Sequence, residues 1–157
     1  MKNLFITLLA LAFMTNFTQA QTEQGPCEGA AGHLHFNGNG FVADTAYAAD
    51  TAYIGPYVQV CESASVNEEA KIQGRVVVKG NAKIYGTAQV SGNTTISDMA
   101  RVFDSAKVSG YAVVTGEAMV NGFATVRGYT IIAGNAWIQG NAIVSGYAQV
   151  FGNAAVE

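Results

Sequence analysis

Apolar and polar positions along this chain recur with a period of six residues. From Gly32 to Glu157 the sequence divides into 21 hexads without an insertion or deletion. The fifth position is Val or Ile in 19 of the 21 hexads, with Phe36 and Ala48 as the exceptions, and the third position is Ala in 15. Gly occupies the first position in 14 hexads and Asp in four. One structural unit is therefore expected to repeat through this region.

The spacing within each hexad indicates a short β-strand followed by a corner. Positions three and five lie two residues apart, so in a strand they point to one side, while positions four and six point to the other. Gly, Asn and Asp at the first two positions are turn residues, because they tolerate the left-handed backbone that a corner requires. A helix is excluded, since six residues match no helical face and the β-branched column opposes it.

Outward residues of similar kind recur at intervals of 18, which predicts three hexads per coil. Tyr85 and Phe103 differ by 18 at position six, and Met119 and Trp137 differ by 18 at position four. The position-two tyrosines that differ by multiples of 18 are Tyr57, Tyr111, Tyr129 and Tyr147. We predict an all-β, single-stranded, triangular parallel β-helix of about seven coils over residues 32–157, about 33 Å long at one strand spacing per coil.

The first 20 residues have the pattern of a secretory signal peptide. Lys2 precedes an apolar run from Leu4 to Met14, and Ala20 provides a small residue for cleavage before Gln21. The run is shorter than a membrane-spanning helix, so no transmembrane anchor is expected in the mature chain. We expect export to the periplasm, cell surface or extracellular space, with residues 21–31 as a lead segment; the alternative is a buried N-terminal helix.

The commonest hexad, Gly-Asn-Ala-x-Val-x, resembles the repeats of the hexapeptide-repeat superfamily. That resemblance spans residues 32–157 and implies a left-handed parallel β-helix. In the acyltransferases of that superfamily the Gly usually follows the aliphatic residue directly, whereas here it comes one residue later, as in Val90-Ser91-Gly92. The pattern is closer to uncharacterised bacterial arrays of this type, so the resemblance implies the fold and leaves the activity open.

Composition narrows the function classes. Charged residues make up 12% of the chain, against about 25% in ordinary soluble proteins. The 50% apolar content excludes an intrinsically disordered chain. The net charge of −3 and eight scattered Lys and Arg residues argue against a nucleic-acid partner, which would require a basic stripe.

The expected export bears on whether the two cysteines form a disulfide bond. In an oxidising compartment Cys27 and Cys61 are able to pair, and the bond would stabilise the fold by about 3–4 kcal/mol in the loop-entropy model. Two readings remain open beside it: two free thiols, or a metal site shared with His33 and His35. The chain has no closely spaced cysteine pair of the kind found in zinc sites.

His33 and His35 are also the weak catalytic candidates. Many hexapeptide-repeat acyltransferases use a histidine at a cleft between subunits of a trimer, and γ-class carbonic anhydrases of similar fold bind a metal through three histidines. This chain has only these two histidines, separated by one residue, so both would project to the same side of an edge strand. We expect both to be exposed. We favour a protein without enzymatic activity or cofactor, with an acyltransferase as an alternative.

Acidic residues at the corners form the other candidate site. In an 18-residue stack Asp44 lies beside Glu62, and Asp50 lies beside Glu68. Like charges one coil apart repel unless a cation or a lysine screens them. A weak calcium site is therefore one interpretation, and a solvated edge with acidic turn residues is the simpler one.

Outward apolar residues suggest a contact surface. Contiguous apolar columns on a flat face exceed what a soluble monomer normally exposes, although strand preferences alone also favour such residues. One face and its corner carry Val77, Thr95, Val113, Ile131, Tyr111, Tyr129 and Tyr147; a second carries Tyr85, Phe103, Met119 and Trp137.

These features favour an exported, non-enzymatic β-helical scaffold that acts through its flat faces. Self-association, adhesion or a structural role in an envelope or matrix would follow, with a homo-oligomer or a surface partner. An ice-binding protein is an alternative, although Thr95 and Thr115 do not form a regular threonine column. A carbohydrate-binding surface on the tyrosine column or around Trp137 is another.

Overall fold

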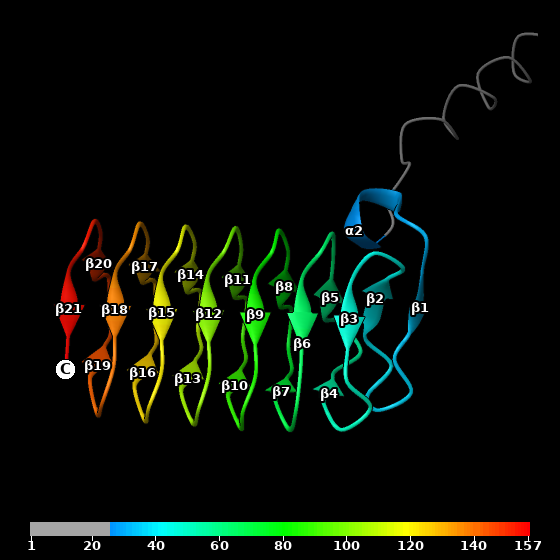
Figure 1. The fold of residues 1–157 in the computed structure, drawn as a ribbon, viewed down its shortest axis with the longest axis horizontal. Helices are drawn as coiled ribbons and strands as arrows, with labels where there is room; N and C mark the ends of the chain where they lie inside the picture. The colour runs from blue at the N-terminus through cyan, green and yellow to red at the C-terminus, as the bar shows by residue number, and fades with distance from the viewer. Residues whose placement is uncertain (1–25) are drawn as a thin grey trace, which may run out of the picture.

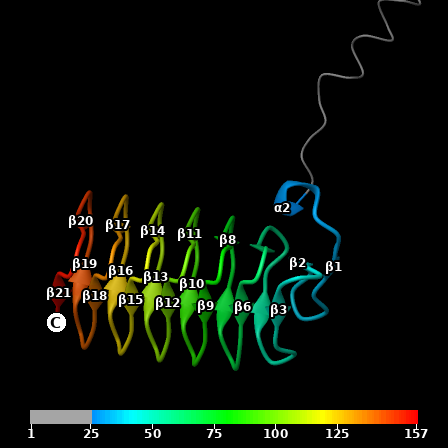
Figure 2. The same ribbon diagram turned by 45° about the horizontal axis from the view of Figure 1, so that its top comes forward.

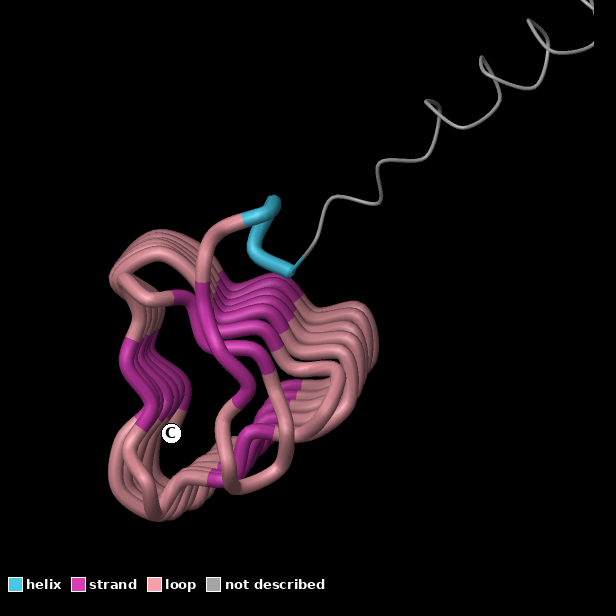
Figure 3. Tube along the Cα trace, turned by 90° about the vertical axis from the view of Figure 1, so that its right-hand side faces the viewer, coloured by secondary structure: helices cyan, strands magenta, loops and turns pink. Residues whose placement is uncertain are grey.

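The computed structural model describes residues 26–157, which wind into a parallel β-solenoid (Figure 1). Seen along its axis, the chain forms three faces joined by corners (Figure 3). Neighbouring coils pair in parallel with an 18-residue offset, as in Thr95 opposite Val113. The predicted β-helix and its 18-residue coil are therefore confirmed, with about six turns.

Three sheets run the length of the solenoid, and α2 (Pro26–Gly29) precedes them as a single turn. Sheet 1 contains β1 (Gly32–Leu34), β2 (Phe41–Ala43), β5 (Gln59–Val60), β8 (Val77–Val78), β11 (Thr95–Ile96), β14 (Val113–Val114), β17 (Ile131–Ile132) and β20 (Gln149–Val150). Sheet 2 contains β3 (Tyr47–Ala48), β6 (Ser65–Val66), β9 (Lys83–Ile84), β12 (Arg101–Val102), β15 (Met119–Val120), β18 (Trp137–Ile138) and β21 (Ala155–Val156). Sheet 3 contains β4 (Tyr53–Ile54), β7 (Lys71–Ile72), β10 (Gln89–Val90), β13 (Lys107–Val108), β16 (Thr125–Val126) and β19 (Ile143–Val144). We call their outward sides face 1, face 2 and face 3.

The core consists of the two inward columns of each hexad. Every position-three Ala and every position-five Val or Ile from Ala52 to Ile138 is 0% exposed. One small and one branched side chain per hexad fill the narrow interior at the density that protein cores require. Burial of these columns is the main source of stability. A single hexad cannot bury its apolar side chains alone, so each coil depends on the coils stacked against it.

The first hexad, residues 32–37, corrects the prediction of seven coils. Its strand β1 pairs with β2 in the antiparallel direction, with Gly32 opposite Ala43. Phe36 stands where all the other hexads except that of Ala48 place Val or Ile, and it is 72% exposed. Gly38 and Asn39, with φ of +116° and +61°, then turn the chain back into the first parallel coil. Figure 2 shows β1 at the end of the stack, beside β2.

Corner glycines allow the coils to approach each other closely. Gly92 has φ of +84°, and a Cβ placed on it would lie 2.5 Å from the carbonyl oxygen of Gly110 in the next coil. That oxygen accepts a hydrogen bond of 2.7 Å from the backbone N–H of Asn93. The glycine therefore serves both the left-handed corner and the hydrogen bond between coils.

A substitution at this corner tests the close approach. We expect Gly92→Ala to lower the free energy of unfolding by about 2–3 kcal/mol, because it adds a steric clash to the strain of a left-handed alanine. The matched control is Gly146→Ala, which has φ of +75° but no atom within 4 Å of the added Cβ. Urea unfolding should show a loss of only about 1 kcal/mol for that control. Equal losses at both sites would show that the backbone angle alone sets the cost.

Candidate binding surface

Face 1 brings together the predicted outward column of sheet 1. Val77, Thr95, Val113 and Ile131 lie in successive strands in direct register. Ser97, Thr115 and Ala133 follow two residues later on the same side of the sheet. These seven residues define the uncharged face, and Lys79 is the one charged side chain at the matching positions of β8, β11, β14 and β17. The predicted column therefore forms one continuous, half-buried surface.

Hydroxyl groups at one side of the uncharged face bond to their own neighbours. The hydroxyl of Ser97 lies 2.9 Å from that of Thr115 in the next coil. Thr115 Oγ1 also donates to Asp98 Oδ2, at the corner. A surface that orders ice needs hydroxyls in regular, available rows, whereas Thr95 and Thr115 stand in different columns and Thr115 is already engaged. This arrangement counts against the ice-binding alternative.

The predicted tyrosine column at the adjoining corner forms a stack of rings. The centroids of Tyr111 and Tyr129 are 4.6 Å apart with an interplanar angle of 1°, and those of Tyr129 and Tyr147 are 5.3 Å apart at 8°. The three residues are 51%, 52% and 81% exposed. Because the rings cover one another's faces, this ladder mainly presents ring edges and hydroxyls. It is poorly suited to stacking against sugar rings, which require open aromatic faces.

Face 2 holds the second predicted column in separate parts. Tyr85 stacks on Phe103 with centroids 4.9 Å apart, and burial raises the pKa of the Tyr85 hydroxyl. Met119 lies in register with Trp137, whose Nε1 donates to Asn121 Oδ1 at 2.7 Å. Lys83 and Arg101 precede Met119 and Trp137 in the same outward column of this face. Face 2 is therefore mixed, and face 1 is the more continuous apolar surface.

Of the two histidines, both predicted to be exposed, His33 is exposed and His35 is buried. His33 lies on the exposed strand β1, with Nδ1 3.8 Å from Asp44 Oδ1. His35 is only 4% exposed, because β1 ends at Leu34 and the hairpin then folds the ring inward. Its Nδ1 is 3.3 Å from the carbonyl oxygen of Asn37, and its Nε2 has no partner among the described residues. His35 lines none of the grooves described below.

The four corner acids do not converge on one site. Glu62 Oε2 accepts a hydrogen bond of 2.8 Å from the backbone N–H of Gly80, in the next coil. Asp44, one coil before Glu62, lies beside His33 instead. Asp50 and Glu68 are the other predicted pair. Their corners are joined by a hydrogen bond from the hydroxyl of Thr51, next to Asp50, to the backbone oxygen of Glu68. Glu62 and Glu68 have positive φ, so both act as corner residues. Across residues 26–157 no three potential metal ligands lie together.

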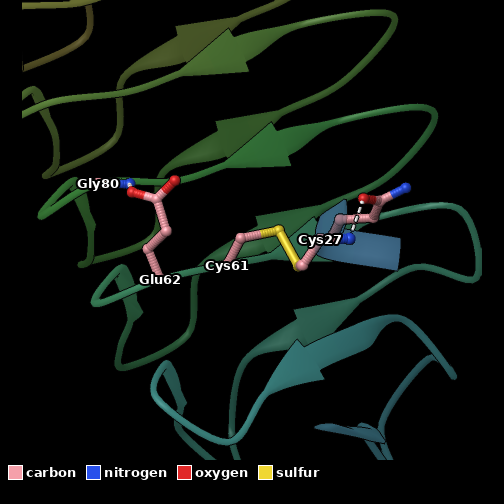
Figure 4. The surroundings of a disulfide bond; sticks show 5 residues. Cys27, Cys61, Glu62 and Gly80 are labelled. Atoms are coloured by element: carbon pink, nitrogen blue, oxygen red, sulfur yellow. Dashed lines mark hydrogen bonds between the residues drawn. A yellow bond between two sulfur atoms is a disulfide. The ribbon is translucent and has the colours of Figure 1, made fainter. Parts of the chain in front are cut away.

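A disulfide fixes the lead segment onto face 1. Cys27 and Cys61 are joined across 34 residues, which is one of the three arrangements that the sequence leaves open (Figure 4). Cys61 occupies an outward position immediately after β5, so α2 lies over this part of sheet 1. The backbone N–H of Cys27 donates to Gln59 Oε1 at 2.9 Å, on the same strand. Residues 26–31 of the lead segment are therefore part of the fold.

Two shallow grooves adjoin this N-terminal part of face 1, and Gln59 and Val77 contribute to both. One, of about 370 Å³, lies beside the disulfide and contains Glu28, Glu62 and Lys79 among its lining residues. The other, of about 460 Å³, lies beside β1 and β2. Sequence reasoning missed both, because the smaller groove depends on the position of residues 27–30 and the larger one on the hairpin that carries Leu34 and Phe41.

The hydrogen bonds at the Asp98 corner carry a pH dependence. The hydroxyl of Thr115 and the N–H of Gly116 hold the pKa of Asp98 below its ordinary value of 3.8. A carboxylate with a lowered pKa contributes stability above its unfolded pKa and loses it as pH falls through the folded pKa. We expect Thr115→Val to raise the pKa of Asp98 in a carboxyl-carbon NMR titration, whereas Thr125→Val on face 3 should not change it. An unchanged pKa in Thr115→Val would contradict the assignment.

No family model, curated protein or solved structure matches this chain. No helix within residues 26–157 has the length and apolarity needed to cross a membrane. The uncharged face, its tyrosine ladder and the two grooves are therefore the features from which a function is inferred.

Proposed function

We propose that this chain is an exported, non-enzymatic scaffold that associates with further copies of itself through the uncharged face. The observation that supports this most directly is the run of Val77, Thr95, Val113 and Ile131 in register across four coils. A solvated monomer would be expected to carry Lys or Glu at such positions, as face 3 does at Lys71 and Lys107. Export is inferred from the N-terminal pattern, and the disulfide suits an oxidising compartment.

The size of face 1 determines what kind of association to expect. The uncharged face spans four of its strands, which at about 4.8 Å spacing and about five residues of width give an area of about 300 Å² per copy. Stable dimers usually bury about 800 Å² per partner. One face-to-face contact is therefore weak, and firm association requires several such contacts in an assembled layer. This favours a structural role in an envelope or matrix over a tight soluble dimer.

Charge placed on the uncharged face tests the proposal. We expect Ile131→Lys to reduce self-association at least tenfold, because each copy would bring an unpaired cation into an apolar contact. The matched control is Ile143→Lys, which changes the same residue type at the same hexad position on face 3, where Ile143 is 64% exposed. Sedimentation velocity over a range of concentrations measures the effect.

The Ile143→Lys control distinguishes a general effect of added surface charge from a specific effect at the contact surface. A wild-type protein that stays monomeric at the highest concentrations would overturn the proposal. Equal losses in Ile131→Lys and Ile143→Lys would do the same, because they would show that added charge opposes association wherever it lies.

A further inference from the structure

The larger groove has a lining that suits a ligand. It lies where the hairpin of β1 and β2 meets the first coils of face 1, and its volume is about 460 Å³, within the range of about 300–1,000 Å³ for small-molecule sites. Its lining consists of Leu34, Phe41, Pro56, Tyr57, Val58, Gln59, Arg75 and Val77.

Charge in this groove has one sign. Arg75 is the only charged lining residue, and no aspartate or glutamate takes part. Arg75 is exposed and forms no ion pair with any residue in the described range 26–157. A guanidinium with its donors available binds a carboxylate through two parallel hydrogen bonds. The groove is thus complementary to an anion, although the chain as a whole has a net charge of −3.

Gln59 adds a second donor. Its Oε1 accepts the backbone N–H of Cys27 at 2.9 Å, and this bond commits the amide oxygen to the protein. The amide nitrogen keeps two N–H donors, and no described residue accepts from them. Gln59 lines this groove as well as the smaller one, so its amide donors are available, together with those of Arg75, to an oxygen-rich ligand.

Aromatic faces complete the site. Tyr57 belongs to the corner column of the tyrosine ladder, yet the next residues of that column are Arg75 and Asn93. Tyr57 is 72% exposed and stacks on no aromatic ring in the described part of the chain, unlike Tyr111 and Tyr129. Its ring faces therefore stay open to a ligand, with the half-buried Phe41 in the same lining.

We propose that this groove binds a carboxylated sugar ring, such as a hexuronate unit of an acidic polysaccharide. Such a ring combines an apolar C–H face for Tyr57 and Phe41 with a carboxylate for Arg75 and hydroxyls for the Gln59 amide. An aliphatic acid fits less well, because a shallow groove with an exposed tyrosine leaves most of a long chain in water. The site shares Val77 with the uncharged face but does not involve Thr95, Val113 or Ile131, so variants at Arg75 and Ile131 test ligand binding and self-association separately.

Calorimetric titration of the disulfide-bonded protein with trigalacturonate tests the proposal. We expect binding that weakens with salt, and at least tenfold weaker binding of a neutral galactose trisaccharide. Arg75→Gln should lower the affinity about tenfold or more, as the loss of a charged hydrogen-bonded pair predicts. Tyr57→Ala should lower it severalfold, because the stacking surface is removed.

Matched variants keep the test specific. Arg127→Gln removes an exposed arginine next to β16 on face 3, and Tyr147→Ala removes a tyrosine of the same corner column far from the groove. Both should bind trigalacturonate as the wild type does. The proposal is overturned if the folded wild-type protein does not bind trigalacturonate, or if Arg127→Gln weakens binding as much as Arg75→Gln. Tighter binding of phenylacetate than of trigalacturonate would also overturn it, in favour of an aryl carboxylate site.

Discussion

The backbone hydrogen bond from each coil to the next is the interaction on which this structure depends. It fixes the register at 18 residues, and every coil must keep that length for Thr95 to meet Val113 and for Asn93 to meet Gly110. The register in turn forces the corners into contact, which explains glycine at Gly92 and acids that accept an amide of the next coil at Glu62 and Asp98. Inward positions then have room for only one small and one branched side chain. The chain is left free to vary only at outward positions.

The sequence predicts the repetitive part of the fold because the same constraint acts at every coil. A column of Val and Ile at one hexad position has no other explanation than a shared interior, and the 18-residue recurrence of Tyr111, Tyr129 and Tyr147 reflects real stacking. Prediction fails where the repetition ends. Phe36 departs from the column, and it marks the hairpin that buries His35 and reverses β1. A count of hexads treats that segment as one more strand of the parallel coil, because period alone carries no information on strand direction.

The candidate sites divide along the same line. The members of the uncharged face could be listed from the sequence, since register places residues 18 apart side by side. The groove at Arg75 could not, because it depends on Leu34 and Phe41, which the hairpin carries there. The sequence also does not predict that the tyrosine rings stack on one another. A column of tyrosines is compatible with sugar binding, but the interplanar angle of 1° shows that Tyr111 and Tyr129 cover each other's faces. Function on such a scaffold is thus inferred best where the repeat is interrupted.

The antiparallel strand β1 also affects how sheet 1 meets other chains. An open sheet edge offers unpaired N–H and C=O groups that recruit further strands, and many proteins cover or shorten such edges. Here β1, three residues long, occupies the edge of sheet 1 beside β2 and runs against the direction of every coil behind it. A coil of another molecule cannot continue the parallel hydrogen-bond ladder of this sheet past a strand of opposite polarity. The hairpin thereby protects this edge of sheet 1 from fibril-like growth.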